Sequence, residues 1–297
     1  MKSAPFEYSR ASDIEEACAL LAGDENARLI AGGQTLVPMM AMRLARPSRL
    51  IDINRIAALA YIRKDGDAVA IGATTRQCVI ERDALVAKHV PLLARAVPWI
   101  GHTATRARGT IGGSLANADP AAEISLTAVT LDAVLTYFAD GKSSNIPARD
   151  FFVGAMVTAL PAGAVLTGVR FPVWSGKVGT GFHEVNARRS DFAFVSAAAQ
   201  VELDGGGTCK RIALAVGAVT DFPIRLDSAE LALKGSKLDD AKARDAVTQA
   251  MSGVEAMADL HASAEYRKRV AVDLATRALA DARDDALGKA QKAEHAH

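Results

Sequence analysis

The sequence predicts an α+β protein with more than one domain, and three features of the chain lead to that prediction. At the N-terminus a strand, a glycine turn, a helix and a second strand follow one another, as in a βαβ unit. Strand-like segments near residues 194–203 and 211–218 flank a glycine-rich turn and predict an antiparallel hairpin. The segment 239–284 is rich in alanine and in alternating charges, which is typical of surface helices.

Composition and charge argue against several classes of function. The 297 residues include 35 Lys+Arg against 34 Asp+Glu, and half of the chain is hydrophobic, so a large core is expected. Without a basic stripe, the chain has no electrostatic signature of a nucleic-acid or anionic-membrane binder. No run approaches the ~18 apolar residues of a membrane span, and the N-terminus lacks an apolar leader. With three widely spaced cysteines, Cys18, Cys78 and Cys209, the sequence predicts a cytoplasmic protein with reduced thiols.

The elements before residue 100 follow from caps and periodicity. Ser12 with Glu15 makes a capping box, and apolar residues recur at helical spacing up to Gly23. The glycine pair 32–33 separates a short apolar strand from a helix that Pro47 must end. The predicted elements are helix 12–23, strand 28–31, helix 35–46, strand 50–53, strand 68–72, helix 74–87 and helix 91–100.

The rest of the chain alternates loops, strands and helices. Residues 101–125 are rich in Gly, Asn and Asp and predict a loop, and the segment 173–181 predicts a linker. Asp140-Gly141 and Asp204–Gly207 are turn sequences between strand-like runs. The predicted elements are strands 133–138, 165–171, 194–203 and 211–218, and helices 239–251 and 263–284.

Two glycine segments are the main candidates for a ligand site. They read Ala-Gly-Gly-Gln-Thr at 31–35 and Thr-Ile-Gly-Gly-Ser at 110–114. Without a Cβ, glycine lets backbone N–H groups approach an anion, and successive N–H groups can form a concave nest. Two nests would match the two phosphates of a pyrophosphate. Either pair alone is better explained as a tight turn, and for the two together both interpretations stay open.

Other phosphate-binding motifs fail at single positions. The sequence Gly141–Ser143 resembles the end of a P-loop, but Thr136 occupies the position of the leading glycine. The sequence Gly179–Gly181 begins like a dinucleotide-binding fingerprint, but Glu184 replaces its third glycine. Neither segment supports an NTPase or a Rossmann dehydrogenase.

The sequence gives little support to a serine hydrolase or a metal site. Residues 112–116 approximate a nucleophile elbow around Ser114, with His183 or His261 as the base, but no buried strand precedes them. A zincin helix would need a second histidine where Ala187 stands, and the cysteines have no cluster spacing. No catalytic residue and no metal ligand is therefore assigned.

Longer segments connect these motifs to a known family. The segments are residues 31–40, 49–56, 109–120, 181–193, 223–225 and 263–267. Across about residues 4–285 the chain resembles the FAD-binding medium subunit of the molybdenum hydroxylases. That family includes the carbon-monoxide dehydrogenase medium subunit and the flavin part of xanthine dehydrogenase.

The resemblance implies a specific form of the α+β class. It is the FAD-binding fold of the vanillyl-alcohol-oxidase/p-cresol-methylhydroxylase type, in which two α/β subdomains, the larger with a mixed sheet, hold FAD between them. A C-terminal domain with a three-stranded antiparallel sheet and helices follows. The expected segments are an N-terminal FAD subdomain at 1–55, a second FAD subdomain at 56–175, the C-terminal flavoprotein domain at 176–285 and a frayed tail at 286–297.

The resemblance also implies which residues contact FAD. The amides of the first glycine segment hold the pyrophosphate, and the second segment matches the other family loop. Asn117 and Glu123 match positions beside the ribityl chain or the isoalloxazine ring, and Ile100 and Leu166 match apolar contacts of the ring. The implied FAD-binding residues are Leu29, Ile30, Ala31, Gly32, Gly33, Gln34, Thr35, Leu36, Ile100, Thr110, Ile111, Gly112, Gly113, Ser114, Asn117, Glu123 and Leu166.

The implied function is electron transfer. Such a subunit carries FAD, takes electrons from the iron–sulfur clusters of a partner and passes them to an external acceptor, while a molybdenum-cofactor partner turns over the substrate. The expected partners are a large molybdenum-cofactor subunit and a small iron–sulfur subunit, assembled as a dimer of heterotrimers. The alternatives are a flavin-free structural or assembly subunit of such a complex, and a serine hydrolase that uses Ser114.

Overall fold

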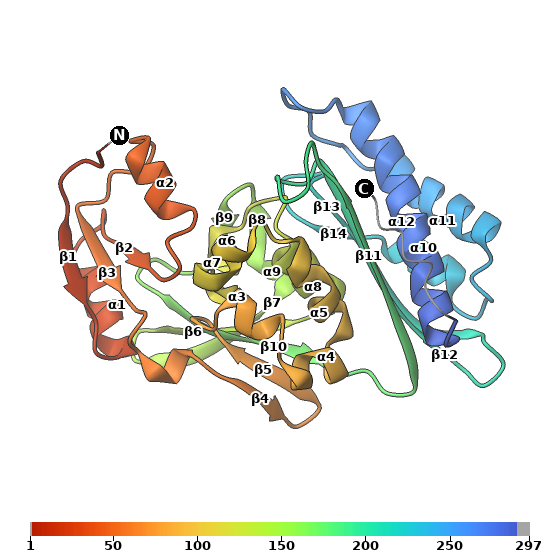
Figure 1. The fold of residues 1–297 in the computed structure, drawn as a ribbon, viewed down its shortest axis with the longest axis horizontal. Coiled ribbons are helices and arrows are strands. Elements are labelled where there is room, and N and C mark those ends of the chain that lie inside the picture. The colour runs from red at the N-terminus through yellow and green to blue at the C-terminus, as the bar shows by residue number, and fades with distance from the viewer. Residues whose placement is uncertain (1, 290–297) are drawn as a thin grey trace.

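The computed structural model describes residues 2–289, which build three main β-sheets in chain order with helices packed against them (Figure 1). This arrangement confirms the predicted α+β class. Among the described residues, no helix combines the length and the apolar character that a membrane span requires. Of the predicted tail 286–297, Ala286 is the last residue of a helix, and 290–297 lie outside the described residues.

The N-terminal sheet is parallel, with strand order β1-β3-β2, as the βαβ pattern predicts. Its elements are β1 (Glu7–Arg10), α1 (Ile14–Ala22), β2 (Arg28–Ile30), α2 (Leu36–Ala41) and β3 (Arg49–Asp52). The sequence did not predict β1. The predicted cap of the first helix is wrong by one residue, because Asp13, not Ser12, accepts the N–H of Glu16 at 2.8 Å. The second helix ends early, since Arg43 takes a left-handed φ of 60°.

The central sheet has the strand order β4-β5-β10-β6-β7. Its strands are β4 (Ile62–Asp65), β5 (Ala68–Gly72), β6 (Val134–Ala139), β7 (Lys142–Pro147) and β10 (Val165–Pro172). All four pairings are antiparallel, so the expectation of a mixed sheet is wrong. The turn between β6 and β7 is confirmed: Asp140 and Gly141 have φ values of 50° and 74°, as in a type I′ hairpin turn.

Short helices cover the central sheet. They are η1 (Ala57–Leu59), α3 (Gln77–Ile80), α4 (Ala84–His89), α5 (Pro91–Ala96), η2 (Val97–Trp99), α6 (Thr103–Arg108), α7 (Ile111–Asn117), α8 (Glu123–Thr130) and α9 (Ala148–Phe151), with a small hairpin of β8 (Phe152–Gly154) and β9 (Val157–Thr158). The loop predicted at 101–125 is therefore wrong. Gly112, Gly113 and Asn117 belong to α7, which Thr110 caps and whose Ile111 and Leu115 are buried.

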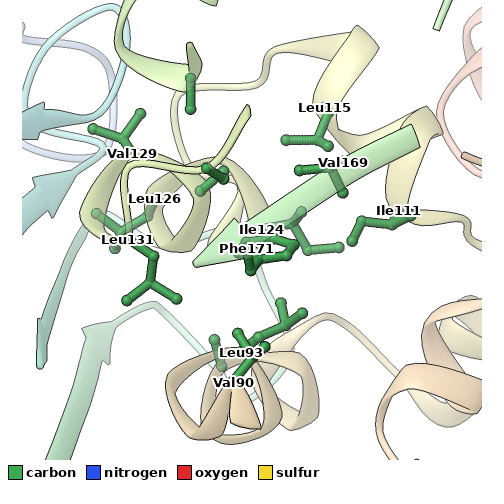
Figure 2. Packing of buried hydrophobic residues seen from close by; sticks show 14 of the residues in the cluster. Val90, Leu93, Ile111, Leu115, Ile124, Leu126, Val129, Leu131, Val169 and Phe171 are labelled. Carbon is green, nitrogen blue, oxygen red and sulfur yellow. The ribbon is translucent and has the colours of Figure 1, made fainter. Parts of the chain in front are cut away.

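The largest apolar core lies between these helices and the central sheet (Figure 2). Leu93 of α5, Leu115 of α7 and Leu126 of α8 meet Phe171 of β10 there, and all four are fully buried. Each such side chain contributes about 1.5–3 kcal/mol to the free energy of folding. This core fixes α7 and α8, and with them the second glycine segment.

The C-terminal sheet is antiparallel, in the order β11-β12-β13-β14. Its elements are β11 (Lys177–Val185), β12 (Val195–Leu203), β13 (Cys209–Gly217) and the two-residue β14 (Ile224–Arg225), followed by α10 (Asp227–Leu233), α11 (Asp240–Ser252) and α12 (Ala264–Ala286). The hairpin of β12 and β13 is as predicted, and the three long strands match the sheet that the resemblance implies. The linker predicted at 173–181 is wrong, because its second half, from Lys177, is the start of β11 and pairs with β12. The helix α12 packs on one face of the sheet, where Gly179 and Gly181 lie directly against its backbone.

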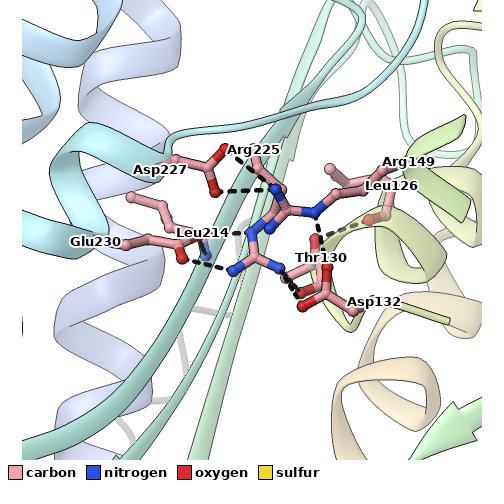
Figure 3. Close-up of polar contacts among 8 residues, drawn as sticks. All are labelled: Leu126, Thr130, Asp132, Arg149, Leu214, Arg225, Asp227 and Glu230. Carbon is pink, nitrogen blue, oxygen red and sulfur yellow. Dashed lines mark hydrogen bonds and ion pairs between the residues drawn. The ribbon is translucent and has the colours of Figure 1, made fainter. Parts of the chain in front are cut away.

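An arginine connects the C-terminal domain, which contains β11–β14 and α10–α12, to the central domain, which contains the five-stranded sheet and its helices (Figure 3). Arg225 of β14 donates to the carbonyl of Thr130 at 2.6 Å and pairs with Glu230 of α10 and Asp132. Arg149, beside it, pairs with Asp132 and Asp227. Because the side chain of Arg225 is only 6% exposed, these charge-assisted contacts hold the two parts in one fixed arrangement.

Candidate functional site

The first glycine segment, residues 31–35, joins β2 to α2 at the carboxyl end of the parallel sheet. Leu29 and Ile30 are the last residues of β2, and Leu36 is the first of α2. Gly33 has φ +70°, a conformation that favours glycine. Within the part of the chain that the structure describes, no atom accepts a hydrogen bond from the amides of residues 32–35. The segment therefore presents backbone donors to a ligand.

Arg108 and Gly109, which directly precede the second glycine segment, lie against the first segment, although they are far from it in the sequence. A Cβ on Gly32 would come within 2.6 Å of the carbonyl oxygen of Arg108 and 2.9 Å of the Cα of Gly109. Only glycine at position 32 allows the two backbones to approach so closely. The structure thus brings together the two segments that the sequence singled out.

Two side chains outside the predicted set hold the segments together. The amide Nδ2 of Asn54 donates to the carbonyl of Ala31 at 2.8 Å, and its Oδ1 accepts from Arg76 at 2.7 Å. Arg76 also donates to the carbonyl of Arg108. Asn54 follows β3 at the same sheet edge as the first glycine segment, and this placement is the signal that could have revealed it.

The second glycine segment differs from the expected amide nest. Residues 110–114 begin α7, with Thr110 as its N-cap. The amides of residues 111–114 are already bonded within the chain: Ile111 to Thr75 O at 3.1 Å, Gly112 to Ala73 O at 2.8 Å, Gly113 to Thr110 Oγ1 at 3.1 Å and Ser114 to Thr110 O at 3.1 Å. The expectation of a second nest is therefore wrong. Gly112 instead permits close packing, since a Cβ there would lie 2.5 Å from the Cβ of Ala73.

A pocket of about 280 Å³ opens where the first glycine segment meets Arg108, which precedes the second segment. Its lining residues are Ile30, Gly32, Gly33, Gln34, Val37, Pro38 and Arg108. Within residues 2–289 the guanidinium of Arg108 forms no ion pair, and no sequence motif pointed to it. Free amides and an unpaired guanidinium are the donor set that a pyrophosphate requires, so the residues present fit that group.

The other predicted residues lie away from this pocket, around the central core. Leu166 on β10 is buried in that core, and Ile100, after η2, packs against it half-exposed. Asn117 ends α7, with its Nδ2 3.8 Å from the sulfur of Met156. Ser114 lies half-buried on α7, and Glu123 is the first residue of α8. A single extended ligand would have to reach from the pocket to these helices.

Two carboxyl groups, Glu123 at the start of α8 and the buried Glu184 of β11, interact electrostatically. Burial raises the pKa of Glu123 to about 7. Burial, and then the charge of Glu123, raises the pKa of Glu184 on β11 to about 9. Glu184 is 8% exposed; its Oε1 accepts from Asn186 at 2.9 Å, and its Oε2 is without a partner among the described residues. Burial also raises the pKa of Asp119. Glu184, which the sequence did not single out as functional, belongs to this cluster.

These shifts predict a stability that falls as the pH rises. A carboxyl whose folded-state pKa lies above its ordinary 4.5 stabilises the fold below pH 4.5, and this contribution is lost as the pH rises through about 7 for Glu123 and about 9 for Glu184. Glu184→Gln removes the loss of stability that accompanies ionisation of Glu184 as the pH rises through about 9. Thermal unfolding of the variant near pH ~9 should come at least ~3 °C above that of the wild type, with little difference near pH ~5.

The matched control is Glu25→Gln, which replaces an exposed glutamate. Its melting curve should follow that of the wild type at every pH. Parallel melting temperatures of the Glu184→Gln variant and the wild type across the whole range would contradict the assignment of a protonated, buried Glu184.

The geometry does not support the hydrolase alternative. His183 bonds to Asp281 of α12 at 3.0 Å, on the face of the C-terminal sheet that α12 covers. The ring of His261 stacks on Phe194 at 5.7 Å. Within the described residues, no hydrogen bond joins Ser114 to either histidine. The arrangement lacks the nucleophile–base contact that covalent catalysis needs.

Known protein families and relatives match the chain along nearly its whole length. The model of the FAD binding domain in molybdopterin dehydrogenase matches residues 4–174, and that of the CO dehydrogenase flavoprotein C-terminal domain matches residues 180–282. The 6-hydroxypseudooxynicotine dehydrogenase complex subunit alpha of Paenarthrobacter nicotinovorans is 37% identical over 99% of this chain and 100% of its own length.

Solved structures agree with the sequence matches. A chain of quinoline 2-oxidoreductase from Pseudomonas putida 86 superposes with a TM-score of 0.92 and 34% identity, covering 97% of this chain and 100% of that one. A chain of the carbon monoxide dehydrogenase from Hydrogenophaga pseudoflava that lacks the Mo-pyranopterin moiety of its cofactor gives a TM-score of 0.92 and 32% identity, covering 96% and 99%.

Proposed function

The chain belongs to the family of FAD-binding subunits of molybdenum hydroxylases, and from this premise we propose that it transfers electrons from the iron–sulfur clusters of a partner subunit to an external acceptor. Its cofactor is FAD, and it is a subunit of an oxidoreductase. FAD, when bound, supplies the redox chemistry, because it accepts single electrons and passes on one or two. The protein supplies binding and orientation.

The observation that carries the proposal is the junction of the two glycine segments. The free amides of residues 32–35 and the guanidinium of Arg108 would hold the pyrophosphate, and Asn54 and Arg76 would keep the segments in register. Ile100, half-exposed against the central core that contains Leu166, supplies apolar surface of the kind that a flavin ring requires. In this assignment the second glycine segment contributes shape and hydroxyl groups rather than amide donors.

Near the ring, the buried carboxyls would set the local charge. We assign Asn117 and Glu123 to the ribityl and isoalloxazine region, and the pKa of Glu123, raised to about 7 by burial, lets this group be neutral or charged near neutral pH. An ionised carboxylate beside the flavin disfavours the addition of electrons, because both are negative. The pair of Glu123 and Glu184 would therefore tune the readiness of the bound flavin to accept electrons.

The partners follow from the same family. The relative with 37% identity is a subunit of a dehydrogenase complex, and we propose that this chain assembles with a large molybdenum-cofactor subunit and a small iron–sulfur subunit as a dimer of heterotrimers. The three cysteines of the chain are too few for the four thiolates of an ordinary iron–sulfur cluster. The substrate would then be turned over in the molybdenum subunit.

The proposal is tested by purifying the chain with the subunits that accompany it in its host. We expect FAD in a one-to-one ratio to the chain, molybdenum and iron in the complex, and bleaching of the flavin absorbance when substrate is added without acceptor. A colourless chain whose melting temperature is unchanged by added FAD would support the flavin-free structural subunit instead. Ester hydrolysis that Ser114→Ala abolishes, in a flavin-free protein, would support the hydrolase.

A further inference from the structure

The helix α6 carries a buried arginine that has no place yet in the candidate site. Arg106 is 8% exposed, and its guanidinium bonds both carboxylate oxygens of Glu81: Nε lies 2.8 Å from Oε2, and Nη2 lies 3.1 Å from Oε1. Glu81 is the residue that ends α3. Because a planar guanidinium bonds two carboxylate oxygens in one orientation only, this pair fixes α6 on α3 with a defined geometry.

The same guanidinium holds the turn that precedes α6. Its Nη1 donates to the carbonyls of Ile100 and Gly101, each at 3.0 Å. Among the described residues, no backbone amide donates to either carbonyl. Gly101 has φ +44°, so the chain bends sharply at this point. Arg106 therefore fixes the backbone of the turn, and with it the position of the half-exposed Ile100.

The other end of α6 forms part of the pocket at the first glycine segment. Arg108, the last residue of the helix, lines this pocket, and its carbonyl accepts a hydrogen bond from Arg76. Gly109 fastens the end of α6 to α3, because its carbonyl accepts the amide of Gln77 at 2.9 Å. The helix has six residues and so a rise of about 9 Å. It is a short, anchored spacer between Ile100 and Arg108.

We propose that the Arg106–Glu81 pair is a positioning element that sets the separation between the apolar surface at Ile100 and the pocket at Arg108. This inference rests on the proposed function, in which one FAD uses both places. A ligand that engages two places at once binds far more tightly than either of its halves, but only where their spacing matches the ligand. Arg106 acts on this spacing through the backbone and is not itself a contact of the cofactor.

The test compares FAD with two of its parts. ADP carries the pyrophosphate, and riboflavin carries the ring and the ribityl chain, so each of them uses one place only. The full chain is freed of flavin reversibly, and the Kd of each ligand is measured by titration calorimetry. A pair that sets the spacing matters for FAD and not for the two parts. An arginine that merely stabilises the fold would change all three affinities alike.

The main variant combines Arg106→Gln with Glu81→Gln, which leaves no unpaired buried charge. A glutamine at position 106 lacks the forked donors that bond Glu81 and both carbonyls at once. We expect the Kd of FAD to rise at least ~10-fold, and those of ADP and riboflavin to change less than ~3-fold. Arg106→Lys, the milder variant, keeps the ion pair without the fork. It should shift the ratio of the FAD and ADP affinities in the same direction by a smaller factor.

The matched control is Arg283→Gln in the C-terminal domain. The side chain of Arg283 is 17% exposed; it donates to the carbonyl of Leu238 at 2.8 Å and pairs with Asp240 and Asp284. This variant should melt earlier than the wild type and keep the wild-type ratio of the FAD and ADP affinities.

Two results for the main variant would overturn the inference alone: FAD that binds as tightly as to the wild type, or ADP that weakens as much as FAD. A wild-type chain that binds FAD but no ADP up to ~10 mM would contradict the pyrophosphate pocket, and the inference with it. A wild-type chain that binds no FAD would contradict the proposed function itself. The three failures are therefore distinguishable.

Discussion

A valine at position 32 is expected to deprive the protein of FAD. The Cβ of any residue there would lie 2.6 Å from the carbonyl oxygen of Arg108 and 2.9 Å from the Cα of Gly109, and both atoms belong to backbone that cannot rotate away. The first glycine segment must then move away from Arg108 and Gly109, which opens the pocket that it forms with Arg108. We expect the flavin-to-protein ratio of Gly32→Val, measured on the purified chain, to fall at least ~10-fold.

The control for this variant is Gly205→Val. Gly205 lies in the turn between β12 and β13, where an added Cβ meets no atom within 4 Å and φ is not in the left-handed region. It should keep its full flavin content. Circular dichroism of both variants separates loss of cofactor from loss of fold, because it reports the helices and sheets independently of the flavin content. Full flavin occupancy in a folded Gly32→Val variant would refute the assignment of the pyrophosphate site.

The local elements of the fold were predictable where short-range chemistry decides them. The turn at Asp140-Gly141 was predictable because both residues tolerate positive φ, and the hairpin of β12 and β13 because polar turn residues separate two apolar runs. The loop predicted at 101–125 fails for a different reason. Its helices are set by tertiary contacts, such as Gly112 against Ala73, which composition does not reveal.

The candidate site likewise has parts that are visible in the sequence and parts that arise only when the chain folds. The two glycine segments are visible in the sequence because each is a glycine pair followed closely by a hydroxyl residue, and the chain has two of them. The contacts that join them are not visible, since Asn54, Arg76 and Arg108 meet only after the parallel sheet and the central helices have formed. The buried pair of Glu123 and Glu184 likewise arises from a helix and a strand that are far apart in the chain.

The Gly-Thr-Gly sequence at 179–181 resembles a ligand-binding motif but serves the packing of a strand against a helix. It begins like a nucleotide-binding fingerprint, yet it lies on β11 beneath α12. A Cβ on Gly179 would be 2.1 Å from the carbonyl oxygen of Ala282, and one on Gly181 would be 2.0 Å from that of Ala278. The helix meets the strand through alanines that are fully buried: Ala271, Ala275, Ala278 and Ala282. Strand and helix backbones are therefore in direct contact.

Gly181→Val should consequently displace α12 and destabilise the C-terminal domain by more than ~4 kcal/mol, because no side chain can move to relieve a clash between two backbones. Gly181→Ala places only one carbon in the same contact, so its loss of stability should be smaller but still clear. Thermal unfolding followed by circular dichroism gives the order wild type, Gly181→Ala, Gly181→Val, with Gly205→Val again melting like the wild type. A Gly181→Val variant that melts within ~2 °C of the wild type would show that α12 can lift away from β11 without cost, and the glycines would then need another explanation.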